Sequence, residues 1–347
     1  MAQPFEPAAA AGVAASAERR YPIEFTAGAG EYFRIWIVNL ALTVVTLGIY
    51  SAWAKVRRRR YFFGHTRIDG EGFEYRANPV AILKGRLIAV AAIAVYYGAG
   101  HFAPQYQLLL WIPLVILGPW LLVRSLAFNA YNTAYRNVRF RFDGTYKGCM
   151  KVVLVYGWLV LFGILYPYFK HRLLRFIVEN HRYGTTRFEA ADFKKPFISA
   201  YANAYGLGLL LLVLAFVGPF VAAREKTAFL FTAGVVLFYG GMFLIFAYIR
   251  ARTINAMWNA IRIGPVRFES ALRARDLIGL YLSNLLAIVF TLGFAAPWAV
   301  VRAMRYRASK TVAIAPGPLD GFAQAEAQQV SVAGEEIADF FDIDIGL

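Results

Sequence analysis

Arginine and aromatic side chains recur in the same spacing at three places in the chain. In each copy an aromatic residue, two arginines and a second aromatic residue stand at positions i, i+4, i+7 and i+8, which share one face of an α-helix. Guanidinium groups bind carboxylates and phosphates, so these arginines are candidates for binding an anionic lipid or a small anion. The copies are Trp53, Arg57, Arg60 and Tyr61; Tyr168, Arg172, Arg175 and Phe176; and Trp298, Arg302, Arg305 and Tyr306.

A second interpretation of these residues is anchoring at the membrane interface. Trp and Tyr favour the depth of the lipid headgroups, and cytoplasmic arginines fix the orientation of a membrane protein. Clustered arginines near a membrane also attract acidic lipid by about 1 kcal/mol per charge. Anchoring is the interpretation we prefer, while the shared helical register leaves the anion site open as an alternative.

An apolar segment broken by glycine precedes each arginine helix. The breaks fall at Thr46 and Gly48, at Gly163, and at Thr291 and Gly293. Non-helical backbone at membrane depth is tolerated only where protein or a water-filled cavity surrounds it. We interpret these residues as the tips of re-entrant or interfacial segments.

Composition identifies the environment of the chain. Of its 347 residues 59% are hydrophobic and 17% are charged, whereas soluble domains are about half apolar and a quarter charged. Three runs contain no charged residue: Leu87–Val123, Thr227–Ile249 and Leu277–Val301. Each is long enough for a spanning helix of roughly 20 residues, so we expect a polytopic helical membrane protein.

The distribution of positive charge decides between two topologies. If seven apolar segments all spanned, Lys and Arg would be shared almost evenly between the two sides, against the positive-inside rule. If the three broken segments return to the side they entered, every Lys and Arg except Arg224 and Lys226 shares one side. We therefore predict an all-α polytopic membrane protein with four spanning helices and three Gly-broken re-entrant or interfacial segments. Seven spans are the alternative.

The basic loops repeat as well. Each carries a short β-like phrase with Phe near its end, such as Gly184–Glu189 and Gly264–Glu269, and these phrases could pair into a small cytoplasmic sheet. Repetition of this kind indicates internal repeats.

The predicted organisation is a disordered segment 1–21, a membrane domain 22–310 and an acidic cytoplasmic tail 311–347. Within the membrane domain, 22–80, 140–195 and 266–310 hold a broken segment plus an arginine helix, and 84–124 and 196–250 hold helical hairpins.

The tail after Lys310 contains no Lys or Arg but several acidic residues. It could cover the basic loops of the same chain. A solubilising tail is the interpretation we prefer, because runs of one charge are usually solvated.

Longer phrases resemble a known family. The stretch Tyr32–Leu40, then Thr46–Arg57, and the closing phrases Gly334–Glu336 and Phe341–Asp344 resemble the YjgN-like family of bacterial inner-membrane proteins. The likeness covers roughly residues 22–347. It implies a multi-pass protein of the bacterial inner membrane, with a domain type of no established activity. No catalytic residue can be transferred from such a family.

Motifs for catalysis, metal binding and nucleotide binding are not recognisable in the sequence, so we expect no cofactor and no catalytic residue. An enzyme would need a site in the loops, for which Asp69, Glu74, Glu179 and Glu189 are the nominal candidates. Nucleic acid is not an expected partner, because anionic lipid competes for positive charges at a membrane surface.

Two functions remain after these exclusions. The first is a transporter or channel-like protein for a small solute or anion, since broken helices often form transport sites. The alternative is a non-enzymatic membrane protein that binds anionic lipid or a partner protein through its arginine faces. Both functions place the chain in the bacterial inner membrane, with both termini and the basic loops in the cytoplasm. A homo-oligomer is left open.

Overall fold

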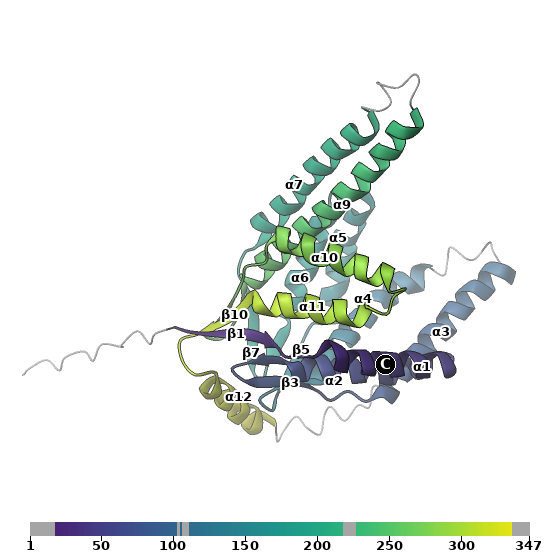
Figure 1. The fold of residues 1–347 in the computed structure, drawn as a ribbon. Coiled ribbons are helices and arrows are strands. Elements are labelled where there is room, and N and C mark those ends of the chain that lie inside the picture. The colour runs from purple at the N-terminus through teal and green to yellow at the C-terminus, as the bar shows by residue number, and fades with distance from the viewer. Residues whose placement is uncertain (1–17, 103–104, 106–110, 218–226, 335–347) are drawn as a thin grey trace, which may run out of the picture.

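The computed structural model describes residues 18–102, 105, 111–217 and 227–334 of the chain. Their backbone forms a small β-barrel from which pairs of helices extend (Figure 1). Within the described residues, ten antiparallel strands close into the order β1-β10-β9-β8-β7-β6-β5-β4-β3-β2. The strands are β1 (Arg19–Phe25), β2 (Thr66–Ile68), β3 (Glu71–Tyr75), β4 (Thr133–Tyr135), β5 (Val138–Phe142), β6 (His181–Tyr183), β7 (Thr186–Ala190), β8 (Ile261–Ile263), β9 (Val266–Ser270) and β10 (Thr311–Ala315).

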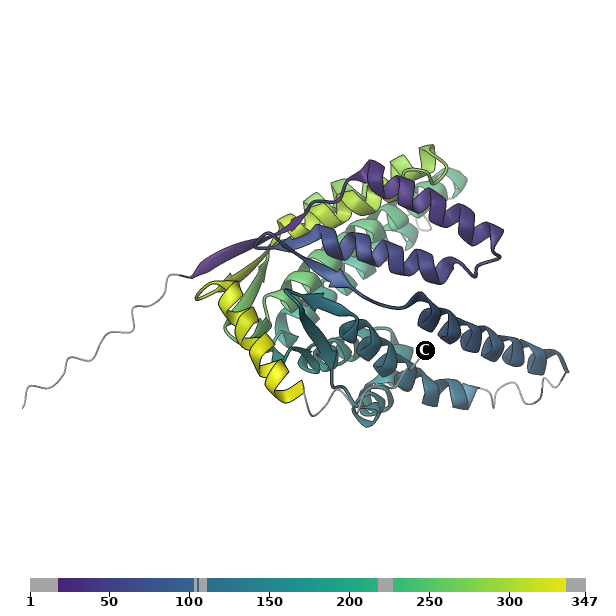
Figure 2. The same ribbon diagram turned by 90° about the horizontal axis from the view of Figure 1, so that it is seen from below.

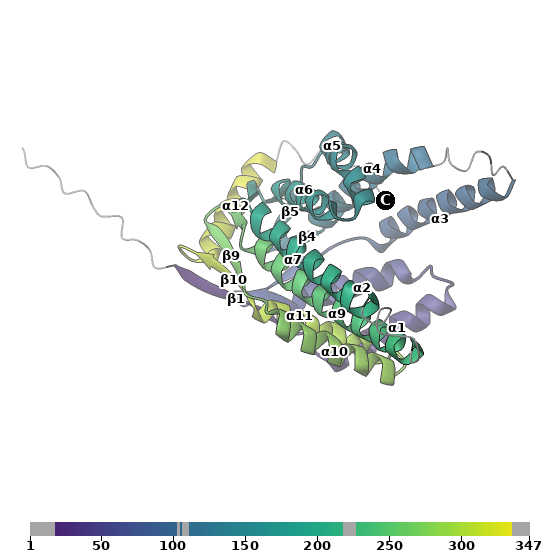
Figure 3. The ribbon, with the colours of Figure 1, turned by 90° about the horizontal axis from the view of Figure 1, so that it is seen from above.

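Helices connect every second pair of neighbouring strands. They all extend from one end of the barrel, and α12 (Leu319–Gly334) lies against the opposite end (Figures 2 and 3). The described helix pairs are α1 (Ala29–Val45) with α2 (Ser51–His65), α3 (Pro79–Phe102) with α4 (Trp111–Tyr131), α5 (Tyr146–Tyr156) and η2 (Gly157–Phe162) with α6 (Tyr166–Glu179), α7 (Lys194–Leu212) and η3 (Val213–Val217) with α9 (Thr227–Trp258), and α10 (Ala274–Phe290) with α11 (Ala296–Ser309).

Two-residue turns join four of the remaining strand pairs, β2–β3, β4–β5, β6–β7 and β8–β9, at the end that α12 covers; β10 and β1 pair without a connection. Asp69 and Gly70 have φ of 53° and 77°, and Arg136 and Asn137 have 48° and 64°. A two-residue hairpin whose turn matches the right-handed twist of its strands requires positive φ at both central residues. Asp, Asn and Gly tolerate positive φ best. Each turn places a three-residue strand beside a five-residue strand, for example Arg182 opposite Arg187.

Phenylalanine fills the barrel. The third residue of four strands is Phe73, Phe140, Phe188 or Phe268, and all four pack against the buried core. Their neighbours along each strand point outward because side chains alternate across a strand. The Phe73 and Phe140 rings have centroids 6.3 Å apart, and those of Phe140 and Phe188 are 6.2 Å apart.

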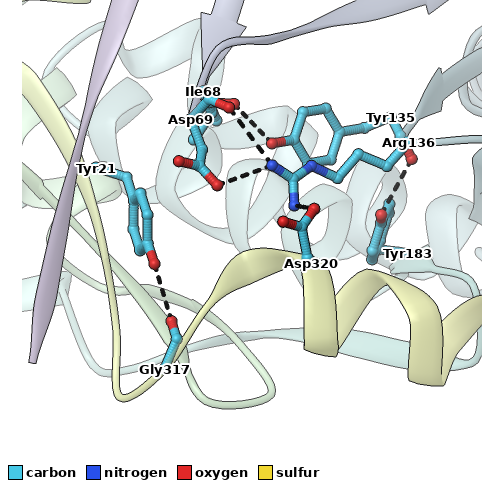
Figure 4. Close-up of polar contacts among 8 residues, drawn as sticks. All are labelled: Tyr21, Ile68, Asp69, Tyr135, Arg136, Tyr183, Gly317 and Asp320. Carbon is cyan, nitrogen blue, oxygen red and sulfur yellow. Dashed lines mark hydrogen bonds and ion pairs between the residues drawn. The ribbon is translucent and has the colours of Figure 1, made fainter.

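Buried tyrosine hydroxyls link successive hairpins inside the barrel. The Tyr135 hydroxyl donates to the carbonyl of Ile68 at 2.8 Å, and the Tyr183 hydroxyl donates to the carbonyl of Tyr135 at 3.0 Å (Figure 4). Ile68, Tyr135 and Tyr183 are the last residues of their three-residue strands. Burial raises the pKa of Tyr135 to about 12, so the hydroxyl keeps its proton as a donor.

The acidic C-terminal segment contacts the barrel through β10 and α12. Leu319, Phe322 and Ala323 on α12 join the barrel core. Arg136 from the β4–β5 turn pairs with Asp69 at 2.8 Å and with Asp320 of α12 (Figure 4). These residues of the tail contact a basic turn of the same chain, and residues 335–347 lie outside the described part.

Glu326 of α12 is 3% exposed and is held by the β6–β7 turn. Its carboxylate accepts from the backbone N–H groups of Thr185 and Thr186 at 2.7 and 3.2 Å, and from both threonine hydroxyls. The two N–H groups and the Thr186 hydroxyl therefore satisfy this buried carboxylate, as a buried charge requires, while the Thr185 hydroxyl shares its single proton with Gln329.

The predicted all-α fold is wrong. The short β-like phrases, which were expected to pair at most into a small sheet, form the closed barrel described above. The sequence could not reveal this because the strands that close the ring, β1 and β10, are separated by almost the whole chain. A small barrel has no sequence signal beyond short alternating segments.

The predicted number of spans is wrong as well. Among the described residues three helices are long and apolar enough to cross a membrane, not four or seven: Pro79–Phe102, Lys194–Phe216 and Phe231–Trp258. The apolar runs around Gly48, Gly163 and Gly293 do not form single long helices. Each is split into two shorter segments at the glycine, which has positive φ.

The N-terminal segment 1–21 was expected to be disordered. Its residues 1–17 lie outside the described residues, and β1 begins at Arg19.

We predict that Glu326→Ala loosens α12 from the barrel. The substitution leaves the N–H groups of Thr185 and Thr186 without their acceptor, and an unsatisfied buried donor costs about 1–3 kcal/mol. Amide hydrogen exchange in α12 of the purified protein should accelerate about tenfold or more, since 1.4 kcal/mol corresponds to a factor of ten. Gln324→Ala, an exposed position on the same helix, is the matched control. Equal exchange in both variants would contradict the role assigned to Glu326.

Candidate functional site

Two of the predicted arginines bind backbone where strands pass into helices. Arg60 donates to the carbonyls of Tyr75 at 3.2 Å and Ala77 at 3.5 Å, between β3 and α3. Arg305 donates to the carbonyl of Ala27 at 2.8 Å, between β1 and α1. Each arginine thereby fixes the start of a neighbouring helix pair.

The other predicted arginines have partners within their own helix pair or are exposed. Arg302 donates to Ser283 at 2.5 Å and Asn284 at 3.3 Å, and it stacks on Trp298. The remaining contacts pair Arg172 with the Tyr168 hydroxyl and the Tyr156 ring, and Arg175 with Glu179; Arg57 is exposed. Within the described residues, no contact brings arginines of the three copies together at one site.

The predicted interface aromatics contact neighbours within their own helix pairs, and Trp298 is 40% exposed. The Tyr61 hydroxyl accepts from the backbone N–H of Gly28 at 3.0 Å and contacts Glu31, at the start of α1. The Tyr306 hydroxyl accepts from the N–H of Arg273 at 3.2 Å, at the start of α10. The remaining aromatics lie against neighbours as well: Phe176 against Gly148, Trp53 beside Tyr50, Tyr168 beside Tyr156, and Trp298 beneath Arg302.

The predicted tips form turns between helices. Thr46 donates from its hydroxyl to Leu42 and accepts from the N–H of Tyr50, and Thr291 makes the same two bonds to Ala287 and Ala295. Gly48 and Gly293 follow with φ of 93° and 95°. Gly163, with φ of 48°, joins η2 to α6, and its carbonyl accepts from the Tyr205 hydroxyl.

A cavity of about 540 Å³ lies beside the first of these turns. Residues of helices α1, α2, α3 and α11 line it. Its lining side chains combine apolar, polar and positively charged groups: Tyr32, Trp36, Asn39, Leu40, Thr43, Ser51, Ala54, Lys55, Arg58, Arg86, Ala296, Pro297 and Val300. We call it the cationic pocket, because Lys55, Arg58 and Arg86 line it and no Asp or Glu does.

The three cations of the pocket come from two helices. Arg86 reaches from α3 and donates to the Ser51 hydroxyl on α2. Among the described residues, Lys55 has no hydrogen-bond acceptor and no acidic partner. Burial lowers the pKa of Lys55, and the positive charges of Arg59, Arg86 and Arg58 lower it further. The pocket is therefore a place where an anion would relieve repulsion between fixed positive charges.

Comparison with the α10–α11 pair shows that α11 lacks this charge. When Thr46 is matched with Thr291 and Gly48 with Gly293, the polar and cationic pocket residues of α2 correspond to apolar residues of α11. Ser51 corresponds to Ala296, Lys55 to Val300 and Arg58 to Ala303. Because Ala296 and Val300 themselves line the pocket, α11 supplies an apolar wall opposite the cations.

Asn39 shows a second difference between the two pairs. Its counterpart Asn284 accepts from Arg302 and donates to the carbonyl of Ala299 at 3.2 Å. Arg302 is held there by the hydroxyl of Ser283, which corresponds to Val38 in α1. Val38 has no hydroxyl, and Arg57, which corresponds to Arg302, is exposed. The Asn39 Oδ1 atom is buried and has no hydrogen-bond partner among the described residues.

The three cations of the pocket are not among the arginines predicted from the repeated spacing. Lys55 and Arg58 stand within the first arginine helix but off the face that repeats, and Arg86 lies in another helix. The signal was nevertheless present. Comparison of the Thr46–Gly48 and Thr291–Gly293 copies residue by residue marks the positions at which only one copy is charged.

His171 is another buried polar group without a partner. It is 1% exposed, and neither ring nitrogen has a hydrogen-bond partner among the described residues. Its ring packs 4.5 Å from Phe193 and 5.9 Å from Phe197, between α6 and α7. Burial lowers the pKa of His171, and the positive charges of Arg172, Arg175 and Lys194 lower it further, against the opposing effect of Asp192.

We predict that His171 makes the fold sensitive to acid. A histidine whose pKa is lowered on folding binds fewer protons in the folded state, so stability is lost as the pH falls below about 6.5, the ordinary value. His171→Phe should therefore gain thermal stability relative to the wild type between pH 7.5 and pH 5.5. His101→Phe, at an exposed position, is the control. The prediction fails if the melting temperatures of both variants follow that of the wild type across this range.

Comparison with known proteins identifies the family. The family model described as bacterial protein of unknown function (DUF898) matches residues 20–340. A relative named Inner membrane protein YjgN, from Salmonella typhimurium strain LT2, is 31% identical over 128 residues. A relative of the same name from Escherichia coli O157:H7 is 30% identical over 139 residues. No solved structure matches the chain.

The two alignments cover 35% and 40% of this chain, and 31% and 35% of the relatives' own lengths. The names of the relatives and the three apolar helices both support an inner-membrane location. The family model extends over nearly the whole chain, including every strand of the barrel except the first residue of β1. The chain therefore belongs to the DUF898 family of bacterial proteins of unknown function.

Proposed function

We propose that this inner-membrane protein binds the phosphate group of an anionic lipid in the cationic pocket. The observation that carries the proposal is the grouping of Lys55, Arg58 and Arg86 around one cavity whose lining contains no acidic residue. Positively charged residues next to a membrane helix attract acidic lipid, by about 1 kcal/mol for each charge. Arg86 lies in α3, one of the helices able to cross a membrane.

The walls of the pocket also fit a lipid. Trp36, Leu40 and Val300 give it an apolar lining next to the three cations. Side chains on the adjoining turn are apolar and uncovered: Leu47 is 94% exposed and Val45 is 79% exposed. A lipid combines an anionic headgroup with acyl chains, and this combination of surfaces would contact both parts.

The orientation that goes with this function has the barrel and α12 in the cytoplasm. Support comes from the positive-inside rule, because the strands and their adjoining helices carry most of the Lys and Arg. The barrel itself is a poor candidate for crossing the membrane. Its strands have three to seven residues, whereas a strand that spans a bilayer needs about 9–11.

Transport of a solute through the barrel finds less support. Phe73, Phe140, Phe188 and Phe268 fill its interior, and α12 covers one end. The pocket opens beside the helices instead. Binding of an anionic headgroup there requires no pathway through the protein.

We predict that Lys55→Gln weakens binding of anionic lipid about fivefold, the factor that corresponds to about 1 kcal/mol. Native mass spectrometry of the purified full-length protein with graded amounts of an anionic phospholipid would measure the effect. Lys84→Gln is the matched control: it removes the same charge from an exposed position near Arg86 but outside the pocket lining. A parallel titration with inorganic phosphate distinguishes a lipid headgroup from a free anion.

Two results would contradict this function. One is wild-type affinity for the lipid in Lys55→Gln. The other is an equal loss in Lys55→Gln and Lys84→Gln, because that would mean attraction by the total positive charge rather than by a pocket.

A further inference from the structure

The outer surface of the barrel carries its charge unevenly. Side chains alternate along a strand, so the residues between the core positions point outward. On β5, β6, β7 and β8 the outward residues are Arg139, Arg141, Arg182, Arg187, Glu189 and Arg262. We call this surface the arginine wall, because five of its six residues are arginines.

The other side of the barrel has no such excess. On β9, β1, β2 and β3 the charged outward residues are three arginines and three glutamates: Arg20, Arg67, Arg267, Glu24, Glu74 and Glu269. Ion pairs connect several of them, since Arg20 and Arg267 both pair with Glu269. Neighbouring residues therefore balance the charge on that side.

Strand pairing places arginines of the wall directly opposite one another. Arg182 lies opposite Arg141 of β5 and opposite Arg187 of β7. Like charges in cross-strand positions repel each other and destabilise a sheet. Asp143 pairs with Arg182, but no described residue forms an ion pair with Arg141 or Arg187, and both are exposed. An acidic group bound here would relieve the repulsion.

Helix α12 leads the chain to the edge of this wall. The Thr185 hydroxyl, in the turn between β6 and β7, contacts the Oε1 atom of Gln329 at 2.6 Å. Arg187 follows Thr185 by two residues. The helix ends at Gly334, about 7.5 Å beyond Gln329 at the rise of an α-helix. The sequence after α12 therefore starts next to the arginine wall.

The residues after α12 have the charge that the wall lacks. Segment 335–347 lies outside the described residues, and its sequence contains no Lys or Arg but five acids: Glu335, Glu336, Asp339, Asp342 and Asp344. A segment of this length can extend over roughly 43 Å, whereas a strand of five residues is roughly 17 Å long. The segment can therefore reach every arginine of the wall. The acids within α12, Asp320 and Glu326, already bind turns of the barrel.

We propose that the acidic segment 335–347 binds the arginine wall of its own barrel through its carboxylates. Carboxylates accept two parallel hydrogen bonds from a guanidinium group, which makes arginine their best cationic partner. Because α12 tethers the segment, its effective concentration at the wall is on the order of mM, so individually weak ion pairs suffice. The wall is separate from the cationic pocket, and the proposal does not depend on lipid binding.

The mobility of a spin label on the segment tests this proposal. A nitroxide is attached to the Ile343→Cys variant of the full-length protein in uncharged detergent micelles. The native Cys149 is buried, and the wild-type protein serves as the control for its labelling. At about 0.01 M salt the label should show the slow motion of a bound segment. About 1 M salt should free it, because the screening length falls to about 3 Å.

A pair of substitutions in the wall locates the contact. Arg141→Gln with Arg187→Gln should lower the ratio of slow to mobile label about fivefold, which corresponds to about 1 kcal/mol for two exposed ion pairs. Arg20→Gln with Arg67→Gln is the matched control, since it removes the same charge from the other side of the barrel. The control should leave the ratio unchanged.

A second pair of substitutions leaves the barrel intact. Asp342→Asn with Asp344→Asn should free the label to a similar extent without changing any residue of the described structure. Release in this variant therefore cannot result from misfolding of the barrel.

Three results would overturn the proposal. A mobile label in the wild-type wall at low salt would mean that the segment is only a solubilising tail. Equal effects of the two pairs of arginine substitutions would mean attraction by the total charge. Loss of the slow motion on tenfold dilution of the protein would mean that the segment binds another copy of the chain.

Discussion

Closure of the strand ladder is the constraint on which the rest of the structure depends. A strand of three residues makes too few backbone hydrogen bonds to be stable alone, and a lone hairpin is marginal in water. In the ring each described strand is paired on both sides, so no edge is left open. Because every helix pair begins and ends in neighbouring strands, the ring also decides which helices lie side by side.

The cationic pocket is a product of that arrangement. Its walls come from α1 and α2, from α3, and from α11 near the far end of the chain. Helix α3 is beside α2 because β2 and β3 are joined by a tight turn, and α11 is beside α1 because β10 pairs with β1. Arg305, which binds the carbonyl of Ala27, strengthens the same contact between the two ends of the chain.

Sequence reasoning was most successful where information is local. The membrane location followed from composition, and the family resemblance is confirmed. The barrel was missed because each strand, such as Ile261–Ile263, is too short to identify its partner. The predicted arginines were chosen for their shared face, yet Arg60 and Arg305 bind backbone that is distant in sequence. Lys55 and Asn39 gain their significance from missing partners, which no single sequence position displays.

The pairing of β1 with β10 has a consequence for the order of synthesis. The ribosome makes Arg19–Phe25 near the beginning and Thr311–Ala315 near the end, so the ring cannot close until almost all of the chain exists. The apolar helices emerge in between and reach the membrane earlier. Non-local strand pairing is slow and leaves open edges exposed to aggregation. Early membrane anchoring of the helices holds the waiting strands close together, which shortens the search that ends with α12 covering the finished barrel.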